Sequence, residues 1–507
     1  MGYGPDAGAH IELGPYPNRV PDEYVAEVTR QVEDERRKGW LRQVAPPPHA
    51  TNAPIQVAVQ PHKVRRITDY SNRGPTGAMR GVNRWVQHGL LPHPEMHSVR
   101  DLSRAVHACT RRSDEPPLLL VRDLSKAYRR IAVRPEDWSS LAFKWAGRWY
   151  VDTRLPFGHA ASAAYCCALS QAICDVLTQR WAGQAYALAY VDDFVLISTP
   201  SFAGVAAADL HQCLHDLGLP VSQPKVQHDG EWSTKAEWIG FVHDTVAKTH
   251  SLARAKRDAY ISGLETVATG WPQVPLHEWD QVIGRLSHVA SAFTPARAII
   301  AEMLRMVTKR GRMVRISVGA LPLLRWWKNF LTNMPRAAPM VRAPSPNDPA
   351  VTSDASLWGL GWAKFRNLFD ATYGGQEDVE WAGWAHVCGR RQPGDMTLLE
   401  AWAALRAVQS AADLGVTGPL WCGVDNVALE WALRKGRSKS LRVNRVVMRA
   451  LFAAAEAGLH IFPFRVSTSQ NWVADRLSRI PQRDESDRRV RNLRARQGRH
   501  IPRETSS

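Results

Sequence analysis

The stretch Tyr190-Val191-Asp192-Asp193 places two adjacent carboxylates between apolar runs, and it constrains the fold more than any other part of the chain. The flanking runs, Ala187-Leu188-Ala189 and Phe194-Val195-Leu196-Ile197, contain no Pro or Gly and predict two strands. A hairpin would carry both acids at its tip, where a divalent cation could offset their repulsion, because hard cations prefer carboxylate oxygen. The alternative is an exposed Asp-Asp turn, since so short a motif also occurs by chance.

A third acid follows another predicted strand. Leu118 to Val121 is a short apolar run after two prolines, which indicates a buried strand, and Asp123 lies at its end. A carboxylate there is costly unless it is paired, solvated or bound to a metal, and a helix N-cap explains Asp123 equally well. Together with Asp192 and Asp193, it predicts acids meeting at one end of a mixed sheet backed by helices. That arrangement is expected of two-metal phosphoryl transfer.

The composition favours a polyanionic partner. The 507 residues carry a formal charge of +17, and 45% of them are hydrophobic, enough for about three or four domains. The seven cysteines lack the paired spacing of a zinc site and indicate a reducing compartment. We find no secretory signal and no apolar run of membrane-spanning length, so we expect an intracellular protein, in the cytoplasm or nucleus, without a membrane partner.

A second acidic set follows a Pro-rich stretch at residues 335–349, which we interpret as a stiff linker and a domain boundary. Asp354 and Asp425 end predicted strands, Glu400 lies on a predicted helix that Thr397 could cap, and Asp475 lies on a last short helix. Caps and solvated helix faces explain each acid singly. Four of them in this order after a linker are harder to explain in that way.

The residues then match a family. Asp123-Leu-Ser-Lys-Ala-Tyr128, Leu155-Pro-Phe-Gly158, Tyr190-Val-Asp-Asp193, Lys225 and Trp238-Ile-Gly-Phe241 resemble, in order, the polymerase blocks of retroelement reverse transcriptases. Residues 350–480 resemble the ribonuclease H domain that follows them, above all through Asn471-Trp-Val-Ala-Asp-Arg-Leu-Ser-Arg479. Each block alone is weak evidence, whereas the ordered set is specific.

The resemblance implies a fold class and a domain order. It implies an α+β and α/β multidomain chain, in which a right-hand polymerase of fingers, palm and thumb precedes a ribonuclease H-like mixed-sheet domain. The expected parts are an N-terminal tail with one helix at 1–50, fingers and palm at 51–245, a helical thumb and connection at 246–334, the linker, the ribonuclease H-like domain at 350–480, and a basic disordered tail at 481–507. The tail either contacts phosphates or is simply solvated.

The resemblance also implies roles for residues. In the palm, Asp123, Asp192 and Asp193 would bind two Mg²⁺ or Mn²⁺, and Lys225 would protonate departing pyrophosphate, unless it is merely a solvated lysine. The expected nucleotide-binding residues are Lys63, Arg65, Tyr128, Phe157 and Gly158, with Tyr128 rejecting a 2′-hydroxyl. The expected primer grip is Trp238, Ile239, Gly240 and Phe241. In the second site, Asp354, Glu400, Asp425 and Asp475 would hold two metals that hydrolyse RNA in a hybrid.

Two departures from the family pattern stand out. Val466-Ser-Thr-Ser-Gln470 lacks the His that many cellular ribonucleases H carry before the last acid, so product release there is expected to be slow. No protease signature or integrase-like zinc spacing is present. The stretch from Asp69 to Asn83 resembles the DIRS-like group, and a gypsy-type LTR element is the alternative.

These observations predict an RNA-directed DNA polymerase with a linked ribonuclease H, acting in retrotransposon replication. Its partners would be an RNA template, a DNA primer, an RNA/DNA hybrid and dNTPs. The rival hypothesis is a decayed or domesticated copy that binds nucleic acid without catalysis, and the presence of all seven predicted ligand acids argues against it. A third possibility is a polymerase whose ribonuclease H is inert.

Overall fold

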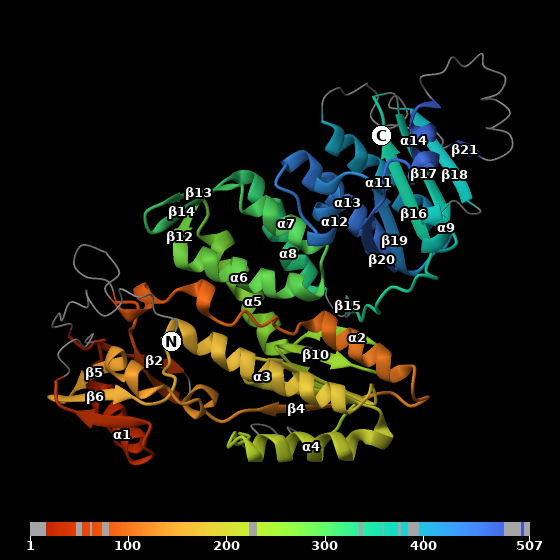
Figure 1. The fold of residues 1–507 in the computed structure, drawn as a ribbon. Coiled ribbons are helices and arrows are strands. Elements are labelled where there is room, and N and C mark those ends of the chain that lie inside the picture. Colours follow the sequence, from red (N-terminus) through yellow and green to blue (C-terminus); the bar gives the residue numbers. More distant parts are fainter. Residues whose placement is uncertain are drawn as a thin grey trace. The chain divides into compact units, whose positions relative to one another are not determined.

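The structure is a computed structural model that describes residues 17–46, 53–60, 63–72, 81–222, 231–333, 338–357, 359–373, 377–383, 395–480 and 498–500. Its contacts divide the chain into two units (Figure 1). Unit 1 comprises residues 1–239 and 244–246, and unit 2 comprises residues 240–243 and 247–507. Each unit is described by itself.

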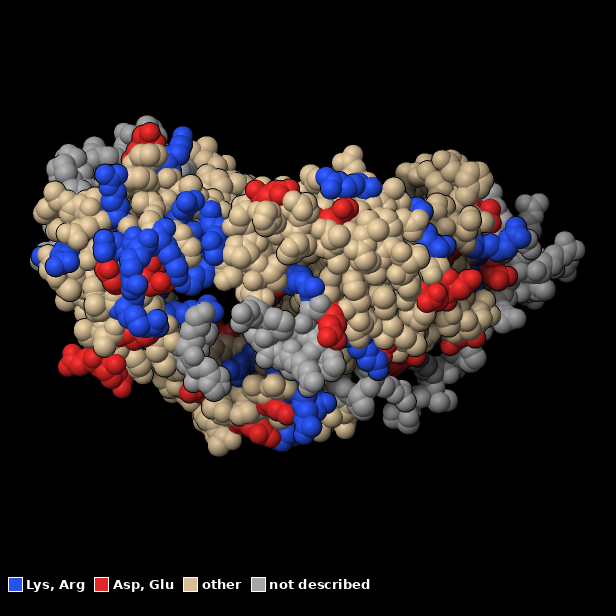
Figure 2. Space-filling view, turned by 90° about the horizontal axis from the view of Figure 1, so that it is seen from below, with Lys and Arg blue, Asp and Glu red and all other residues tan. Residues whose placement is uncertain are grey.

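The first part of unit 1 is a small β-rich region that combines a helix and a strand of the predicted N-terminal tail with strands of the predicted fingers. Its elements are α1 (Asp22–Arg37), β1 (Leu41–Val44), β2 (Ile55–Gln60), β3 (Lys63–Thr68), β5 (Ala142–Trp145) and β6 (Arg148–Asp152). Strands β2 and β3 form an antiparallel pair, and a second sheet has the order β1-β6-β5. Figure 2 shows Lys and Arg side chains gathered over this region with acidic side chains among them. On α1 many of these charges pair at one-turn spacing, as Arg36 does with Glu33.

A buried ionic network ties these elements together. The Arg129 guanidinium lies 2.5 Å from Asp152 and 2.8 Å from Glu35, and Arg66 lies 2.7 Å from Glu35. The Tyr70 hydroxyl donates to the other Asp152 oxygen at 3.0 Å. Because buried charges are stable only when paired and hydrogen-bonded, this network fixes which face of β3 is buried.

The rest of unit 1 is the predicted palm, built on a three-stranded sheet of order β4-β8-β7. Its elements are α2 (Val99–Thr110), β4 (Leu118–Asp123), α3 (Ala160–Arg180), β7 (Ala185–Tyr190), β8 (Asp193–Ser198), α4 (Ala203–Asp216) and β9 (Lys235–Trp238). Short 3₁₀ turns connect several of them, including Ala127–Arg130 and Pro135–Leu141. Residues of α3 and α4, among them Ile173 and Leu210, share one core cluster with Leu120 and Leu196 of the strands.

Helix α3 corrects one expectation from the sequence. Among the described helices it alone is long and apolar enough to cross a membrane, with a mean hydropathy of 1.4 over an 18-residue window. The expectation that no apolar run approaches that length is therefore wrong. The evidence for a membrane span is weak, because Cys166, Ile173 and Leu177 of this helix are buried in the palm core and a core helix passes the same test.

Unit 2 begins with a mostly helical region, as predicted for residues 250–334. Its elements are β10 (Phe241–Asp244), β11 (Thr249–Leu252), α5 (Arg254–Thr269), β12 (Gln273–Pro275), α6 (Leu276–Ala292), α7 (Ala296–Met303), β13 (Val307–Arg310), β14 (Met313–Ile316), α8 (Leu321–Thr332) and β15 (Ala338–Pro339). The sequence pattern missed the small sheet of order β12-β14-β13 between the helices. The apolar stripe of α6, including Trp279, Val282 and Leu286, is buried as core.

The second part of unit 2 is a mixed sheet covered by helices. Its elements are β16 (Ala350–Ala355), β17 (Gly359–Phe365), α9 (Leu368–Tyr373), β18 (Glu377–Gly383), α11 (Met396–Asp413), β19 (Gly418–Val424), α12 (Val427–Lys435), α13 (Leu441–Glu456), β20 (Leu459–Arg465), α14 (Trp472–Ser478) and β21 (Gly498–His500). The strand order is β20-β19-β16-β17-β18-β21, and β16 runs parallel to β19 and antiparallel to β17. Residues 498–500 thus join the sheet, which differs from the predicted disordered tail.

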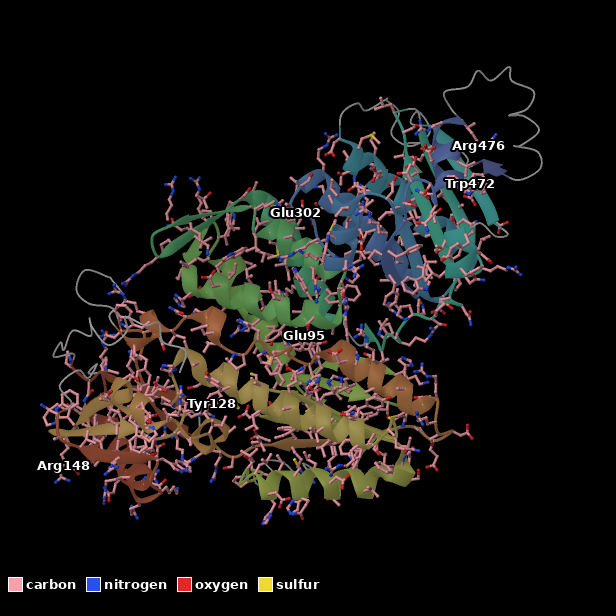
Figure 3. The ribbon with its side chains drawn as sticks, in the orientation of Figure 1. Glu95, Tyr128, Arg148, Glu302, Trp472 and Arg476 are labelled. Atoms are coloured by element: carbon pink, nitrogen blue, oxygen red, sulfur yellow. The ribbon has the colours of Figure 1, made fainter. Side chains whose placement is uncertain are left out.

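The predicted linker at 335–349 does not coincide with the division between the two units. Helices α7 and α13 pack together: Arg445 of α13 lies 2.9 Å from the buried Glu302 (labelled in Figure 3), and Asn444 donates to the Ala298 carbonyl at 3.0 Å. The ring of Phe452 lies 5.5 Å from that of Trp326. This packing holds the helical region and the mixed-sheet region in one unit. The predicted domain boundaries stay predictions.

Candidate active sites

The register of the palm sheet places two of the predicted acids directly opposite each other on neighbouring strands. Strands β4 and β8 are antiparallel, and Asp123 is the direct partner of Asp193. Directly opposed residues of an antiparallel pair have their side chains on the same face. No helix begins at Asp123, because the next helical turn starts at Ala127 after Lys126, so the N-cap alternative fails.

Asp192 occupies a strained turn between β7 and β8. Tyr190 pairs with Asp193, which leaves Val191 and Asp192 as a two-residue hairpin loop. Val191 has φ of +60°, a conformation that a β-branched residue rarely adopts and that glycine usually fills in such turns. Strain of this kind clusters at functional sites, where the surrounding structure enforces it. The predicted hairpin tip is therefore present.

Three of the predicted nucleotide-binding residues lie close to one another. The guanidinium of Arg65 lies 6.0 Å from the centre of the Phe157 ring, whose centre is 5.0 Å from that of Tyr128. Burial, helped by Cys166 and Asp192, raises the pKa of Tyr128 to about 12. Figure 3 labels Tyr128, which lies between the fingers strands and α3. Aromatic rings such as these can pack against a sugar, and the guanidinium beside them can bind a phosphate.

Position 158 accommodates only glycine, because a side chain there would clash with the neighbouring backbone. Its φ is +93°, and a Cβ there would lie 2.2 Å from the Thr68 carbonyl oxygen. Asn83 supports the same turn, since its amide donates to the Gly158 carbonyl at 2.8 Å and accepts from the Ala160 backbone N–H at 2.8 Å. Sequence reasoning placed Asn83 only in a fingers stretch and missed this role.

The predicted primer-grip residues form a tight turn. Ile239 and Gly240 both have positive φ, 46° and 82°, which is the pattern of a two-residue hairpin turn. Trp238 and Phe241 are buried. The Trp238 indole N–H donates to the Asp193 carbonyl at 3.1 Å, so Trp238 contacts the backbone of the hairpin that carries Asp192 and Asp193.

Two predicted residues lie wholly or partly outside the described part of the chain. Lys225 falls within residues 223–230, which the structure does not describe, and for Lys63 only the backbone in β3 is described. The predicted roles of both side chains stay predictions.

The second acidic set gathers at one end of the mixed sheet. Asp354 lies near the end of β16, and Asp425 directly follows the adjacent parallel strand β19, so both are at the same edge. Glu400 comes from α11 and Asp475 from α14. The cap of α11 is Asp395, which accepts from the Leu398 N–H, so the predicted cap Thr397 is wrong.

Three acids of the second set have raised pKa values. Burial, with Asp425 and Asp354 nearby, raises the pKa of Glu400 to about 8, although a hydrogen bond from Asn426 opposes the change. Burial, with Asp425 and Asp475, raises the pKa of Asp354 to about 6 against a hydrogen bond from Ser478. Burial also raises the pKa of Asp425. Mutual elevation is typical of carboxylates that share a site.

Helix α14 positions two of these acids. The Ser478 hydroxyl donates to Asp354 at 2.7 Å, and Arg479 binds Asp475 at 2.6 Å. A Cβ on Gly361 would lie 2.3 Å from the Ala474 carbonyl oxygen, so glycine at that position lets α14 approach β17 closely. Ser478 and Arg479 belong to the motif at residues 471–479, but the motif does not indicate which residues they contact.

The donor chemistry of both sites fits a hard divalent cation. In the second site Glu400 Oε2 is buried without a hydrogen-bond partner among the described residues, which is costly unless a cation binds it. Within the described ranges no three His, Cys, Asp or Glu side chains already stand close enough to hold a metal. Like charges are not expected to converge fully until a cation offsets their repulsion.

A comparison with protein families matches the part of the chain that contains the first acidic set. Residues 74–243 match the family model described as reverse transcriptase (RNA-dependent DNA polymerase). No curated protein matches the chain.

Among solved structures, the foamy viral protease-reverse transcriptase with an RNA/DNA hybrid is 16% identical, with a TM-score of 0.50, and covers 90% of this chain. The chain spans 56% of that protein's length. The same viral enzyme with dsDNA is 17% identical, with a TM-score of 0.49, and covers 90% of this chain and 87% of that one.

The predicted multidomain fold with a right-hand polymerase is confirmed, as is the resemblance to retroelement reverse transcriptases. The linked ribonuclease H and the gypsy or DIRS type stay predictions. The chain therefore carries a reverse transcriptase (RNA-dependent DNA polymerase) domain.

Proposed function

We propose that the chain is the replication enzyme of a retrotransposon, which copies RNA into DNA and degrades the RNA strand of the resulting hybrid. The polymerase part rests on the reverse transcriptase domain. The nuclease part rests on one observation: four acids from four elements meet at one sheet edge, where a buried Glu400 oxygen has no described partner.

In the polymerase site, Asp123, Asp192 and Asp193 would hold Mg²⁺ or Mn²⁺. The cations would supply charge neutralisation for the attacking and leaving oxygens. The protein supplies position: the β4–β8 ladder opposes Asp123 and Asp193, and the strained turn presents Asp192. Arg65, Phe157 and Tyr128 would bind the incoming dNTP from the side of the fingers.

In the nuclease site, Asp354, Glu400, Asp425 and Asp475 would hold the cations that activate water against an RNA phosphate. Ser478 and Arg479 orient two of these carboxylates. The net charge of +17 suits a hybrid duplex that is bound through its phosphates and 2′-hydroxyls.

The experiment is primer extension on RNA and on DNA templates with Mg²⁺ and dNTPs, read in parallel with degradation of a labelled RNA/DNA hybrid. We expect DNA synthesis on both templates and loss of the RNA strand. Binding of the hybrid without either activity would favour a decayed or domesticated copy. Synthesis without RNA loss would leave a polymerase with an inert nuclease.

A further inference from the structure

We propose that Ser170 on α3 is a positioning residue for DNA synthesis, which acts by holding the hairpin turn that presents Asp192. The proposal rests on the polymerase function given above. It concerns a residue outside the motifs by which the site was recognised.

The turn needs an external restraint. Val191 adopts φ of +60° at the first position of a two-residue loop, where glycine would be unstrained. Its side chain packs partly buried against the palm core. A non-glycine residue persists in such a conformation only when contacts around it enforce it.

Ser170 supplies a restraint at that residue. Its hydroxyl donates to the Val191 carbonyl at 2.6 Å, and Ser170 is only 2% exposed. A helical Ser often donates to the carbonyl four residues earlier in its own helix, whereas this bond leaves α3 and reaches the hairpin. Because water has little access there, no solvent molecule replaces the hydroxyl easily.

The neighbouring carbonyls are held as well. The Leu124 N–H donates to the Asp192 carbonyl at 3.1 Å, and the Trp238 indole donates to the Asp193 carbonyl at 3.1 Å. Three consecutive carbonyls are thus fixed from three elements: α3, the end of β4 and β9. Of the three donors, Ser170 is the one that acts on the strained residue.

Asp192 also lies close enough to α3 to affect the pKa values of two of its residues. Asp192 contributes to the raised pKa values of Cys166 and Cys167, one turn before Ser170, after the larger effect of burial. A displacement of the turn relative to α3 would therefore change the position of Asp192 relative to Cys166 and Cys167. Misplacement of a catalytic group by about 1 Å can cost about 100-fold in rate.

The test compares Ser170→Ala with Thr178→Val. Thr178 lies on the same helix and also bonds the same strand, accepting from the Ala187 N–H at 3.0 Å, but two turns away from the hairpin. Ser170→Ala removes the hydrogen bond from α3 to the turn, whereas Thr178→Val removes the bonds from α3 to β7, because the Thr178 hydroxyl also donates to the Ala187 carbonyl at 3.5 Å. Single-nucleotide addition is followed under single-turnover conditions over a series of dNTP and Mg²⁺ concentrations, with melting temperature measured for each variant.

We expect Ser170→Ala to lower the maximal addition rate by about 10- to 100-fold with little change in dNTP affinity, because position matters in the transition state. Thr178→Val should keep the wild-type rate while melting at a similar temperature to Ser170→Ala. Equal rates in the two variants would overturn the proposal.

If Ser170→Ala does not fold, Ser170→Thr and Ser170→Val replace it, since these two have the same shape and differ in the hydroxyl. Ser170→Thr should have a maximal addition rate about 10- to 100-fold higher than that of Ser170→Val. Equal rates in these two variants would overturn the proposal. A wild-type chain that adds no nucleotide at all would instead refute the proposed function.

Discussion

The two acidic sites are assembled in different ways. In the palm, Asp123 and Asp193 lie on one three-stranded sheet and Asp192 lies in the turn between two of its strands, so the strand register and that turn settle their positions. In the mixed-sheet region, Asp354 and Asp425 come from parallel neighbours, while Glu400 and Asp475 are brought in by separate helices. The first site is set by local backbone geometry and the second by tertiary packing.

This difference predicts different sensitivities. A palm site built on a turn should depend on the few contacts that hold its backbone. A site drawn from four elements, with Asp354 only 6% exposed, should depend on the packing of those elements and on the cation that satisfies their charges.

The largest effect is expected from neutralising one acid in each site. Asp192→Asn keeps the side-chain shape and removes a charge that the metals need, so it should abolish DNA synthesis and leave hybrid cleavage. Asp425→Asn should do the reverse. Primer extension and hybrid degradation are measured at fixed ionic strength, because both activities require the same salt-sensitive duplex.

Each variant serves as the control for the other, and thermal melting checks that both are folded. Loss of both activities in a normally melting Asp192→Asn protein would show that the sites are not independent.

The next effect concerns proton supply at the palm. If Lys225 protonates the departing pyrophosphate, Lys225→Ala should lower the nucleotide-addition rate by on the order of 10²–10⁴ with a smaller change in dNTP affinity. Hybrid cleavage should not change, since in the proposed function the acids of the second site would carry that reaction. A wild-type single-turnover rate would mean that Lys225 is merely a solvated lysine.

A smaller, selective effect is expected at Tyr128. Its ring packs edge-on against Phe157 at 5.0 Å, where the resemblance places the barrier to ribose. Tyr128→Ala should relax the preference for dNTPs over rNTPs, because discrimination here is steric. Tyr128→Phe keeps the ring and should keep the preference. The ratio of addition efficiencies for a matched dNTP and rNTP measures this, and an unchanged ratio in an active Tyr128→Ala enzyme would refute the role.

The smallest effect is a pH dependence of stability that arises in the second site. The folded protein raises the pKa of Glu400 to about 8 and that of Asp354 to about 6, mainly by burial. In the unfolded chain such groups titrate near about 4, so between about pH 4 and pH 8 the folded state holds more protons. The free energy of unfolding should therefore fall as pH rises through this window.

Melting temperatures in a chelator between about pH 5 and pH 8 measure this trend. Added Mg²⁺ binds the deprotonated carboxylates and should stabilise the protein more at higher pH. Glu400→Gln should flatten both trends. A melting temperature that rises with pH in the chelator would contradict the burial of these acids.

Much of the palm could be predicted from the sequence, because its chemistry follows strand ends and a hairpin that are visible as apolar runs around acids. The register that opposes Asp123 to Asp193 could not be predicted. Nor could the hydroxyl of Ser170, because nothing in a small-residue helix indicates which residue faces the turn.

The second site was predicted only as an ordered set of acids. Its convergence depends on α11 and α14 packing against the sheet, which a sequence pattern does not determine. The cap of α11 was misplaced because Asp395 and Thr397 are both good capping residues, and the Thr397 hydroxyl instead accepts from Asn426 at 3.2 Å.

The packing of α7 and α8 against α13 has a practical consequence for protein production. A polymerase fragment that ends after α8 would lack Phe452 and the rest of α13. Its loss would uncover the rings of Phe293 and Trp326, which contact Phe452, next to the ring of Phe330, which contacts both of them. Contiguous exposed aromatic surface promotes aggregation. A well-behaved truncated enzyme would need polar residues at those positions, and low yield of a simple truncation would reflect its new surface and not a defect in its palm.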